Sequence, residues 1–283
     1  IMAVRFLAFI PLVFLSGAVS AEPAAGFRLL HGFHLEQIAA EPLVTDPVDI
    51  AYDEDGRAYV AEMNDYPYTD KAAHKPNQVN PADKSIGKIR LLVDTNDDGV
   101  FDKSTIFADG LSWPTGVVCW KGGIYVCATP DLWYFKDTDG NGGADERRKV
   151  YTGFRKLNVQ ALVNNPIWGL DNQIYFSAST NGGTIEKTDD PNFKPLNLSR
   201  NDLRLDPRTE LLTLESGYGR FGNAFDDFEF GGDVEVAIAY DPDIYIDGNS
   251  CNDDTSSANN QFRVENADVM AFLRGSATSR TFR

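Results

Sequence analysis

Hydrophobic and polar residues alternate along much of this chain with the two-residue period of β-strands. The alternation is interrupted at regular points by glycine-containing turns. Three segments read as strand, tight turn and strand, with a tyrosine at the corresponding position of each, namely 49–62, 116–128 and 166–178. No stretch keeps a 3.6-residue apolar period long enough for a core helix. The pattern therefore predicts an all-β protein.

The spacing of these units favours a β-propeller. Two similar acidic segments begin at Asp94 and Asp137, 43 residues apart, which is close to the ~40–45 residues of a four-stranded blade. At this period, residues 27–228 supply about four blades' worth of repeats. Residues 64–85 are polar and contain three prolines, so we expect a long covering or functional loop there. We predict a partial β-propeller with long loops.

The two ends of the chain differ from this pattern. Residues 1–21 combine Arg5, an apolar run and the small residues of a cleavage site, which is typical of a secretory signal and too short to span a membrane. We expect a periplasmic or extracellular mature protein without a membrane span. Residues 229–283 are rich in Asn, Asp and Ser and lack the strand–turn repeat. They are either a truncated or frame-disturbed end, or an irregular C-terminal tail.

The net charge of the chain limits the kinds of partner that it can bind. The 283 residues carry a formal net charge of −16 and a pI near 4.5. Nucleic-acid binding requires basic patches, so the composition argues against it. An anionic membrane surface is disfavoured for the same reason. The balance suits a secreted protein that binds cations.

The two acidic segments have the spacing of calcium loops. They read D-x-N-x-D-G-x-x-D and D-x-D-x-N-G-x-x-D, with oxygen side chains at positions 1, 3, 5 and 9 and glycine at 6. An EF-hand would need Glu at position 12, where the chain has Thr105 and Arg148, so we predict calcium loops between β-strands. The alternative is a pair of Asx-turns without metal. The candidate ligands are Asp94, Asn96, Asp98, the Val100 carbonyl and Asp102, and Asp137, Asp139, Asn141, the Gly143 carbonyl and Asp145.

Three cysteines leave the redox state open. Cys119 and Cys127 flank a hairpin turn. A three-residue loop at 122–124 would place them opposite each other, close enough for a disulfide; two buried free thiols are the alternative. Cys251 is left over. No C-x-x-C-H motif occurs, so the chain contains no covalent haem site.

Several phrases together resemble a known family. They are Gly32-Phe-His-Leu, Tyr59-Val-Ala-Glu-Met-Asn-Asp-Tyr-Pro67, Phe107-Ala-Asp-Gly-Leu-Ser-Trp-Pro-Thr-Gly116, Trp168-Gly-Leu-Asp171 and Arg220-Phe-Gly-Asn-Ala-Phe-Asp-Asp-Phe228. Their order, over residues 27–228, resembles the N-terminal propeller of the "membrane-bound dehydrogenase domain" proteins of planctomycetes. That propeller is similar to soluble glucose and sorbosone dehydrogenases, which use pyrroloquinoline quinone and calcium. The resemblance implies oxidation of a sugar or polyol, with electrons passing to a cytochrome c domain or protein. Family members often carry that domain downstream, and its absence here favours truncation.

Quinone-dependent oxidation requires a base for the hydroxyl proton, and the resemblance implies a histidine. Of the three histidines, His74 in the long loop is the best candidate, whereas His31 and His34 suit solvated and structural roles. Glu62 or Asp65 is a substitute base, or else caps a strand end or pairs with an arginine.

An anionic quinone would also need cationic and aromatic contacts. Arg90 and Arg220 are candidate clamps, because a guanidinium binds carboxylates bidentately; exposed salt bridges are their alternative role. Trp113 and Trp168 are candidates to stack on a sugar or quinone, or else they pack between blades. The chain as a whole is either an oxidoreductase or a non-catalytic module that binds carbohydrate or protein, in which calcium only fixes loops.

Overall fold

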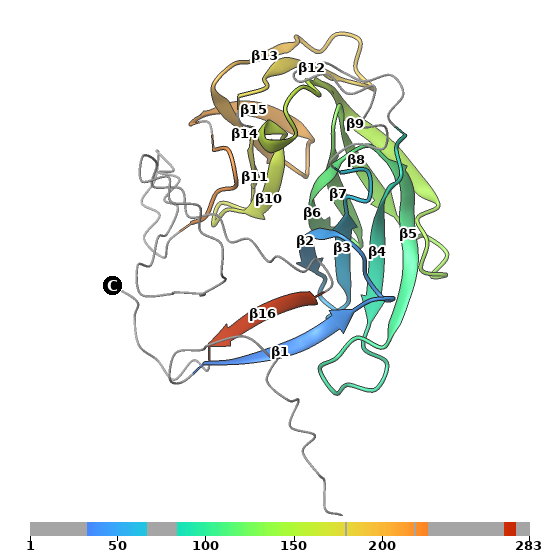
Figure 1. The fold of residues 1–283 in the computed structure, drawn as a ribbon. Helices are drawn as coiled ribbons and strands as arrows, with labels where there is room; N and C mark the ends of the chain where they lie inside the picture. Colours follow the sequence, from blue (N-terminus) through green and yellow to red (C-terminus); the bar gives the residue numbers. More distant parts are fainter. Residues whose placement is uncertain (1–32, 67–83, 179, 218, 226–268, 276–283) are drawn as a thin grey trace, which may run out of the picture.

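The computed structural model describes residues 33–66, 84–178, 180–217, 219–225 and 269–275. This part of the chain is almost entirely β-structure (Figure 1), with a single 3₁₀ turn, η1 (Val159–Ala161), and no α-helix. It contains three antiparallel sheets that follow one another along the chain, each built around four strands. The predicted all-β fold and the partial propeller are therefore confirmed. The signal segment, the long loop with His74, and most of the tail lie outside the described residues.

Each of the three sheets is a blade. The first contains β2 (Pro47–Tyr52), β3 (Ala58–Glu62), β4 (Gly87–Val93) and β5 (Lys103–Leu111). The second contains β6 (Pro114–Trp120), β7 (Gly123–Ala128), β8 (Asp131–Lys136) and β9 (Glu146–Phe154). The third contains β10 (Asn164–Trp168), β11 (Ile174–Ser177), β14 (Asn201–Asp206) and β15 (Leu211–Ser216). The first strand of each blade is innermost, because β6 packs against both β2 and β10.

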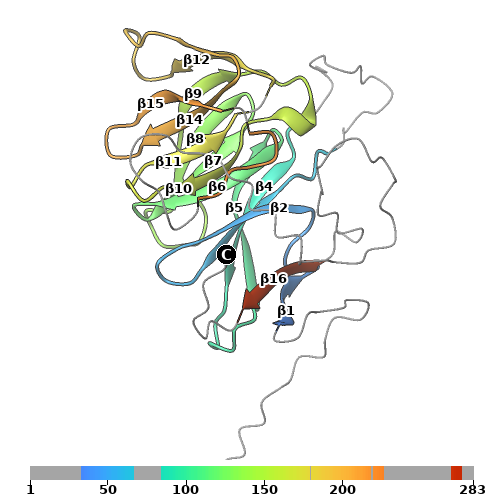
Figure 2. The same ribbon diagram turned by 90° about the vertical axis from the view of Figure 1, so that its left-hand side faces the viewer.

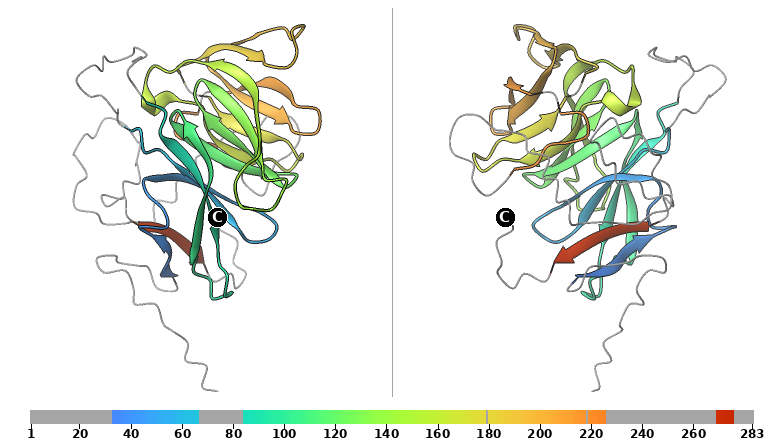
Figure 3. Two further views of the ribbon diagram at one scale, coloured as in Figure 1. Left: turned by 90° about the vertical axis from the view of Figure 1, so that its right-hand side faces the viewer. Right: turned by 60° about the vertical axis from the view of Figure 1, so that its left-hand side comes forward.

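A hairpin from the third blade extends the second. Between β11 and β14 the chain forms β12 (Gly183–Lys187) and β13 (Leu196–Leu198), and β12 pairs with β9 to give a six-stranded sheet. Two glycines allow this pairing: a Cβ on Gly153 would lie 1.9 Å from the Thr184 carbonyl oxygen, and one on Gly183 would lie 2.2 Å from that of Gly153. The hairpin lies at the end of the molecule opposite the pair of β1 (Phe33–Ala40) and β16 (Val269–Gly275) in every view (Figures 2 and 3).

Strand β1 lies beside the acidic loop of the first blade in the same way that β5 lies beside the acidic loop of the second blade. The Phe101 N–H donates to the Ile38 carbonyl of β1 at 2.9 Å, and the Ala144 N–H donates to the Phe107 carbonyl of β5 at 2.8 Å. Phe101 and Ala144 occupy the same position in the two acidic loops. Each loop thus packs against the outer strand that precedes its own blade.

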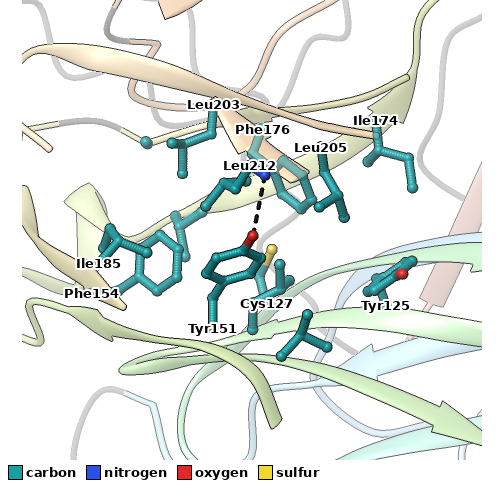
Figure 4. Packing of buried hydrophobic residues seen from close by; sticks show 14 of the residues in the cluster. Tyr125, Cys127, Tyr151, Phe154, Ile174, Phe176, Ile185, Leu203, Leu205 and Leu212 are labelled. Atoms are coloured by element: carbon teal, nitrogen blue, oxygen red, sulfur yellow. Dashed lines mark hydrogen bonds between the residues drawn. The ribbon is translucent and has the colours of Figure 1, made fainter. Parts of the chain in front are cut away.

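The core lies between the blades. Alternate side chains of the strands fill two large apolar clusters, one between the first and second blades and one between the second and third. In the second cluster, the fully buried Tyr151 accepts a hydrogen bond on its hydroxyl from the Leu212 N–H at 3.2 Å (Figure 4). The tyrosines at the three repeat positions, Tyr59, Tyr125 and Tyr175, are all buried. The sequence repeat therefore marks equivalent packing positions in successive blades.

The predicted three-residue loop at 122–124 is wrong. Trp120 pairs with Gly123, so the turn has two residues, Lys121 and Gly122, with φ of 52° and 71°. Positive φ at both central residues is the hairpin geometry that follows strand twist. The shorter turn pairs Cys119 with Ile124 and places Cys127 opposite Gly116, and both thiols are free.

Candidate functional site

The blades present two rims with different chemistry. One rim, here called the proline rim, is where the inner strands begin, at Pro47, Pro114 and close to Pro166. The other, the acidic rim, carries the turns that join the third and fourth strands of a blade, including the two acidic loops. Antiparallel pairing also brings the ends of β3, β7, β11 and β15 to the proline rim.

The proline rim is built from a repeated feature that sequence analysis missed. Asp46, Trp113 and Asn165 each precede one of the rim prolines and have positive φ, at 46°, 44° and 48°. Such φ values are uncommon for residues other than glycine, and for a side chain as bulky as tryptophan they are outliers. Strained backbone of this kind gathers at functional sites. The recurring X-Pro pair before each inner strand was the available signal.

Glu62 and Arg90 form a buried ion pair beneath this rim. The carboxylate of Glu62 is fully buried at the end of β3, and Arg90 Nε donates to both of its oxygens at 3.2 Å. The Thr45 N–H donates to Glu62 Oε1 at 2.7 Å. The charge of Arg90 is thus compensated, and the carboxylate of Glu62 is held by three hydrogen bonds.

Asp65 and Trp113 lie at the same rim but face the protein interior. The buried Asp65 accepts a hydrogen bond on Oδ2 from the Trp113 N–H at 3.0 Å. The Trp113 side chain is only 2% exposed and packs with Met63 and Leu162. Lys156 Nζ lies 4.2 Å from the centre of its ring, a cation–π contact. The Trp113 ring therefore packs between blades, and the ammonium group of Lys156 covers it.

Trp168 is at the other rim. It ends β10, is 38% exposed, and its ring lies 5.5 Å from that of Trp120. The two candidate stacking residues, Trp113 and Trp168, are therefore on opposite rims and do not contribute to one site.

Asp49 is a candidate that the sequence analysis missed. It lies on the innermost strand β2, and its Oδ2 accepts a hydrogen bond from the Val117 N–H of β6 at 2.8 Å. Burial between the two inner strands raises the pKa of the Asp49 carboxyl from 3.8 to about 6, although the Val117 and Ile50 N–H groups oppose the shift. The residue as a whole is partly exposed to solvent. An acidic residue in an alternating apolar strand was the only sequence signal.

Arg220 lies beyond the third blade, in a segment that is tied to the proline rim. Its Nε donates to the Gln160 carbonyl at 3.3 Å, and its Nη2 donates to Gln160 Oε1 at 3.2 Å. Its guanidinium also lies 5.3 Å from the centre of the Phe221 ring. None of these partners is negatively charged.

The two acidic loops have the same internal geometry. The first residue of each, Asp94 or Asp137, accepts hydrogen bonds from loop N–H groups, including that of the glycine at position 6, at 2.8 Å in both. These glycines have φ of 90° and 89°. Position 5, Asp98 or Asn141, accepts from the N–H of position 7 at 2.9 and 2.8 Å. The loops are therefore one structural motif used twice.

The position-9 carboxylates point to a neighbouring threonine. Asp102 accepts from the Thr95 N–H and hydroxyl at 3.1 and 2.6 Å, and Asp145 has the same partners in Thr138. Within the described residues, no three His, Cys, Asp or Glu side chains converge in a metal-holding group. Position 3, Asn96 or Asp139, contributes its oxygens to the same turn. The predicted calcium site, with ligands at positions 1, 3, 5 and 9 and the carbonyl at position 7, stays a prediction.

The electrostatics of the loops follow from these bonds. The Gly99 N–H, with those of Asn96 and Asp98, lowers the pKa of Asp94. Desolvation works against ionisation of Asp137, but the Gly142 and Gly140 N–H groups outweigh it and lower the pKa of its carboxyl. Both carboxylates are consequently ionised at neutral pH, as a cation ligand must be.

Comparison with solved structures finds weak similarity to several enzymes. The chain aligns with the holo form of the pyranose dehydrogenase PQQ domain from Coprinopsis cinerea at 14% identity and a TM-score of 0.42, covering 69% of this chain and 39% of that one. It aligns with an oxidoreductase (glucose dehydrogenase) from Thermus thermophilus at 16% identity and a TM-score of 0.39, covering 63% of this chain and 48% of that one. It aligns with the Trichoderma reesei Carbohydrate-Active Enzymes Family AA12 structure at 17% identity and a TM-score of 0.36, covering 56% of this chain and 35% of that one.

The chain thus spans between a third and a half of the length of these structures, and at such scores the fold assignment depends on the strand topology described above. In the part of the chain that the structure describes, no helix is long and apolar enough to cross a membrane. No curated protein matches the chain. One family model does match, over residues 20–260, and its description is a domain of unknown function, DUF7133. The chain belongs to the DUF7133 family.

Proposed function

We propose that this chain is the propeller of a quinone-dependent oxidoreductase that oxidises a sugar or polyol. The observation that carries the proposal is Asp49, a carboxyl between two inner strands whose pKa burial raises to about 6. A general base is most effective when its pKa is close to the working pH. Removal of a hydroxyl proton during alcohol oxidation requires such a base.

The remaining residues of the proline rim have supporting roles. Glu62 and Arg90 neutralise each other, so we assign them to holding the end of β3 and the start of β2 in place. Asp65 fixes the backbone of Trp113. Arg220 is charged and has no carboxylate partner within the described residues, so it fits an anionic quinone, whereas Arg90 does not. A bound pyrroloquinoline quinone would supply the two-electron acceptor, and Asp49 would hold the substrate proton on its carboxyl.

The wider setting is also part of the proposal. We infer that calcium binds the two loops of the acidic rim, and that a cytochrome c domain or protein receives the electrons. The apolar segment at residues 1–21 supports a periplasmic or extracellular location.

A non-catalytic module that binds carbohydrate or protein is the second candidate. The observation that favours it is that both oxygens of Glu62 and Oδ2 of Asp65 already accept hydrogen bonds from the protein. These oxygens are therefore already engaged within the fold. The two candidate functions differ in whether the protein oxidises a substrate with Asp49 as the base.

Dye reduction with the quinone, calcium and a panel of sugars and polyols tests the proposal. We expect turnover by the wild type and a loss of about 100-fold or more in kcat for Asp49→Asn, with quinone binding retained. Asp190→Asn is the matched control, because Asp190 is exposed and its side chain accepts the nearby Asn192 N–H in a local turn. Absence of dye reduction by a wild type that binds the quinone would favour the binding module.

A further inference from the structure

Arg220 differs from the other arginines of this acidic protein. Nine arginines lie in the part of the chain described with side chains, and six of them form an ion pair with Asp or Glu within 4.0 Å. Arg155, Arg200 and Arg220 form none within this part. Of these three, only Arg220 has its guanidinium held by other side-chain and backbone groups. A fixed cation with no carboxylate partner among the described residues is unusual in a chain with a net charge of −16.

The backbone on both sides of Arg220 is fixed. The Arg220 carbonyl accepts a hydrogen bond from Asn164 Nδ2 at 3.1 Å. One residue earlier, the Gly219 N–H donates to both oxygens of the buried Asp202 at 3.1 Å. Three residues later, the Asn223 N–H donates to Asn165 Oδ1 at 2.8 Å. The third blade therefore holds this segment in one conformation.

Gln160 fixes the guanidinium itself and leaves one edge of it available. Gln160 lies in the 3₁₀ turn η1, and its N–H is capped by Asn158 Oδ1 at 3.0 Å. Its carbonyl and its side-chain oxygen take hydrogen bonds from Nε and Nη2 of Arg220. A guanidinium has five N–H donors, so the Nη1 group and the second Nη2 hydrogen have no acceptor in the part of the chain that the structure describes. These groups form the fork that binds a carboxylate through two parallel hydrogen bonds.

Phe221 places an apolar surface beside this fork. The Phe221 side chain is 48% exposed, and the Arg220 guanidinium lies 5.3 Å from the centre of its ring. An exposed aromatic ring next to a fixed guanidinium suits a ligand that has a ring face and a carboxylate substituent. Long-range repulsion of an anion by the acidic protein is screened beyond about 8 Å at physiological salt.

We propose that Arg220, Gln160 and Phe221 form a binding site for a carboxylate carried on a ring. Arg220 binds the carboxylate, Gln160 orients the guanidinium, and Phe221 contacts the ring. Sugar acids and pyrroloquinoline quinone share this chemistry. The inference deepens the proposed function, on which it rests for the role of the ligand, but binding at the site requires no turnover.

Isothermal titration calorimetry on the full chain tests the site with three probes: galacturonate, pyrroloquinoline quinone and the neutral sugar galactose. We expect at least one of the two carboxylates to bind with a Kd below about 1 mM, and galactose to bind at least about tenfold more weakly. Arg220→Gln should weaken carboxylate binding about tenfold or more. Gln160→Ala should weaken it by a smaller factor, because the guanidinium keeps its charge but loses its orientation.

Arg155→Gln is the matched control. It removes the same charge from an exposed arginine whose side chain makes no hydrogen bond or ion pair with the described residues, and we expect less than a twofold change in Kd. Circular dichroism confirms that each variant is folded. Equal losses in Arg155→Gln and Arg220→Gln would reduce the effect to net charge and overturn the proposal, as would failure of the wild type to bind either carboxylate.

The probes also separate this inference from the proposed function. Loss of only galacturonate binding in Arg220→Gln assigns the site to an acidic substrate, and loss of only quinone binding assigns it to the cofactor. Arg220-dependent binding without any dye reduction would leave the site in place and refute the oxidoreductase. Dye reduction that is independent of Arg220, with no Arg220-dependent binding, would support the oxidoreductase and refute the carboxylate site.

Discussion

Asp49→Asn should stabilise the protein at neutral pH and have little effect at acidic pH. The substitution keeps the size of the side chain and an oxygen that can accept the Val117 N–H. It removes only the ability to ionise. Because burial raises the pKa of Asp49 from 3.8 to about 6, the folded protein binds a proton more tightly than the unfolded chain does. The wild type therefore loses stability as the pH rises through this interval, and the variant does not.

The size of the change in the free energy of unfolding follows from the shift in the pKa of Asp49. About two pKa units correspond to roughly 3 kcal/mol, at about 1.4 kcal/mol per unit. Because Asp49 is not fully buried, solvent screens part of the charge, so we halve this value to about 1.5 kcal/mol. The stability gap between variant and wild type should open between pH ~4 and ~6 and remain constant above it.

Urea unfolding followed by circular dichroism, at pH 4.5 and pH 8, measures this gap. A variant that is equally or less stable than the wild type at pH 8 would show that the Asp49 carboxylate is solvated or paired in the folded protein. A gap that is the same at both pH values would also refute the reasoning, since ionisation would then not be its cause. Asp190→Asn is again the control for replacing Asp with Asn at an exposed position.

Three further variants test separate parts of the fold. Arg90→Met should cost about 3–5 kcal/mol in urea unfolding, because it leaves the Glu62 carboxylate buried without its cation. Gly153→Ala should cost more than about 2 kcal/mol, because a Cβ there would lie 1.9 Å from a carbonyl oxygen of β12 and φ is 104°. Asp94→Ala combined with Asp137→Ala should abolish the rise in Tm that calcium produces; identical melting of the wild type in calcium and in chelator would show that the loops are only turns.

Each of these changes has a matched control. Arg57→Met breaks a more exposed ion pair with Asp53 and should cost less than about 1 kcal/mol. Gly56→Ala also requires positive φ, 78°, but meets no atom within 4 Å, so it isolates the conformational cost from the steric one. Asp206→Ala alters the corresponding turn of the third blade, which lacks the acidic-loop sequence. It should leave the calcium response unchanged.

The parts of the fold that could be predicted depend on local pattern. Alternation and turn residues identify the paired strands around Tyr59, Tyr125 and Tyr175, because each hairpin is specified by residues close together in the sequence. The acidic loops could be recognised for the same reason. The β12–β13 hairpin could not, since its partner β9 lies some thirty residues earlier and the pairing depends on the close approach of Gly153 and Gly183.

The candidate site was harder to predict because burial and partners decide the role of each side chain. Glu62 and Arg90 are 28 positions apart, and only the pairing of β3 with β4 brings them together. Asp49 reads as an ordinary strand residue until β6 covers it. Arg220 was found from its sequence phrase, but only the fold shows that it has no acidic partner among the described residues. His74 lies outside the described residues, and its predicted role stays a prediction.

The separation of the two rims limits what calcium can do in this protein. The second acidic loop contacts the preceding blade, where the Thr105 hydroxyl donates to the Gly142 carbonyl at 3.2 Å and the Ala144 N–H donates to the Phe107 carbonyl. Both loops lie at the rim opposite Asp65 and Trp113. A cation bound there would reinforce the packing of one blade on the next, and it would not polarise a substrate at the proline rim. Calcium removal should consequently lower Tm, and any loss of activity should track that loss of stability.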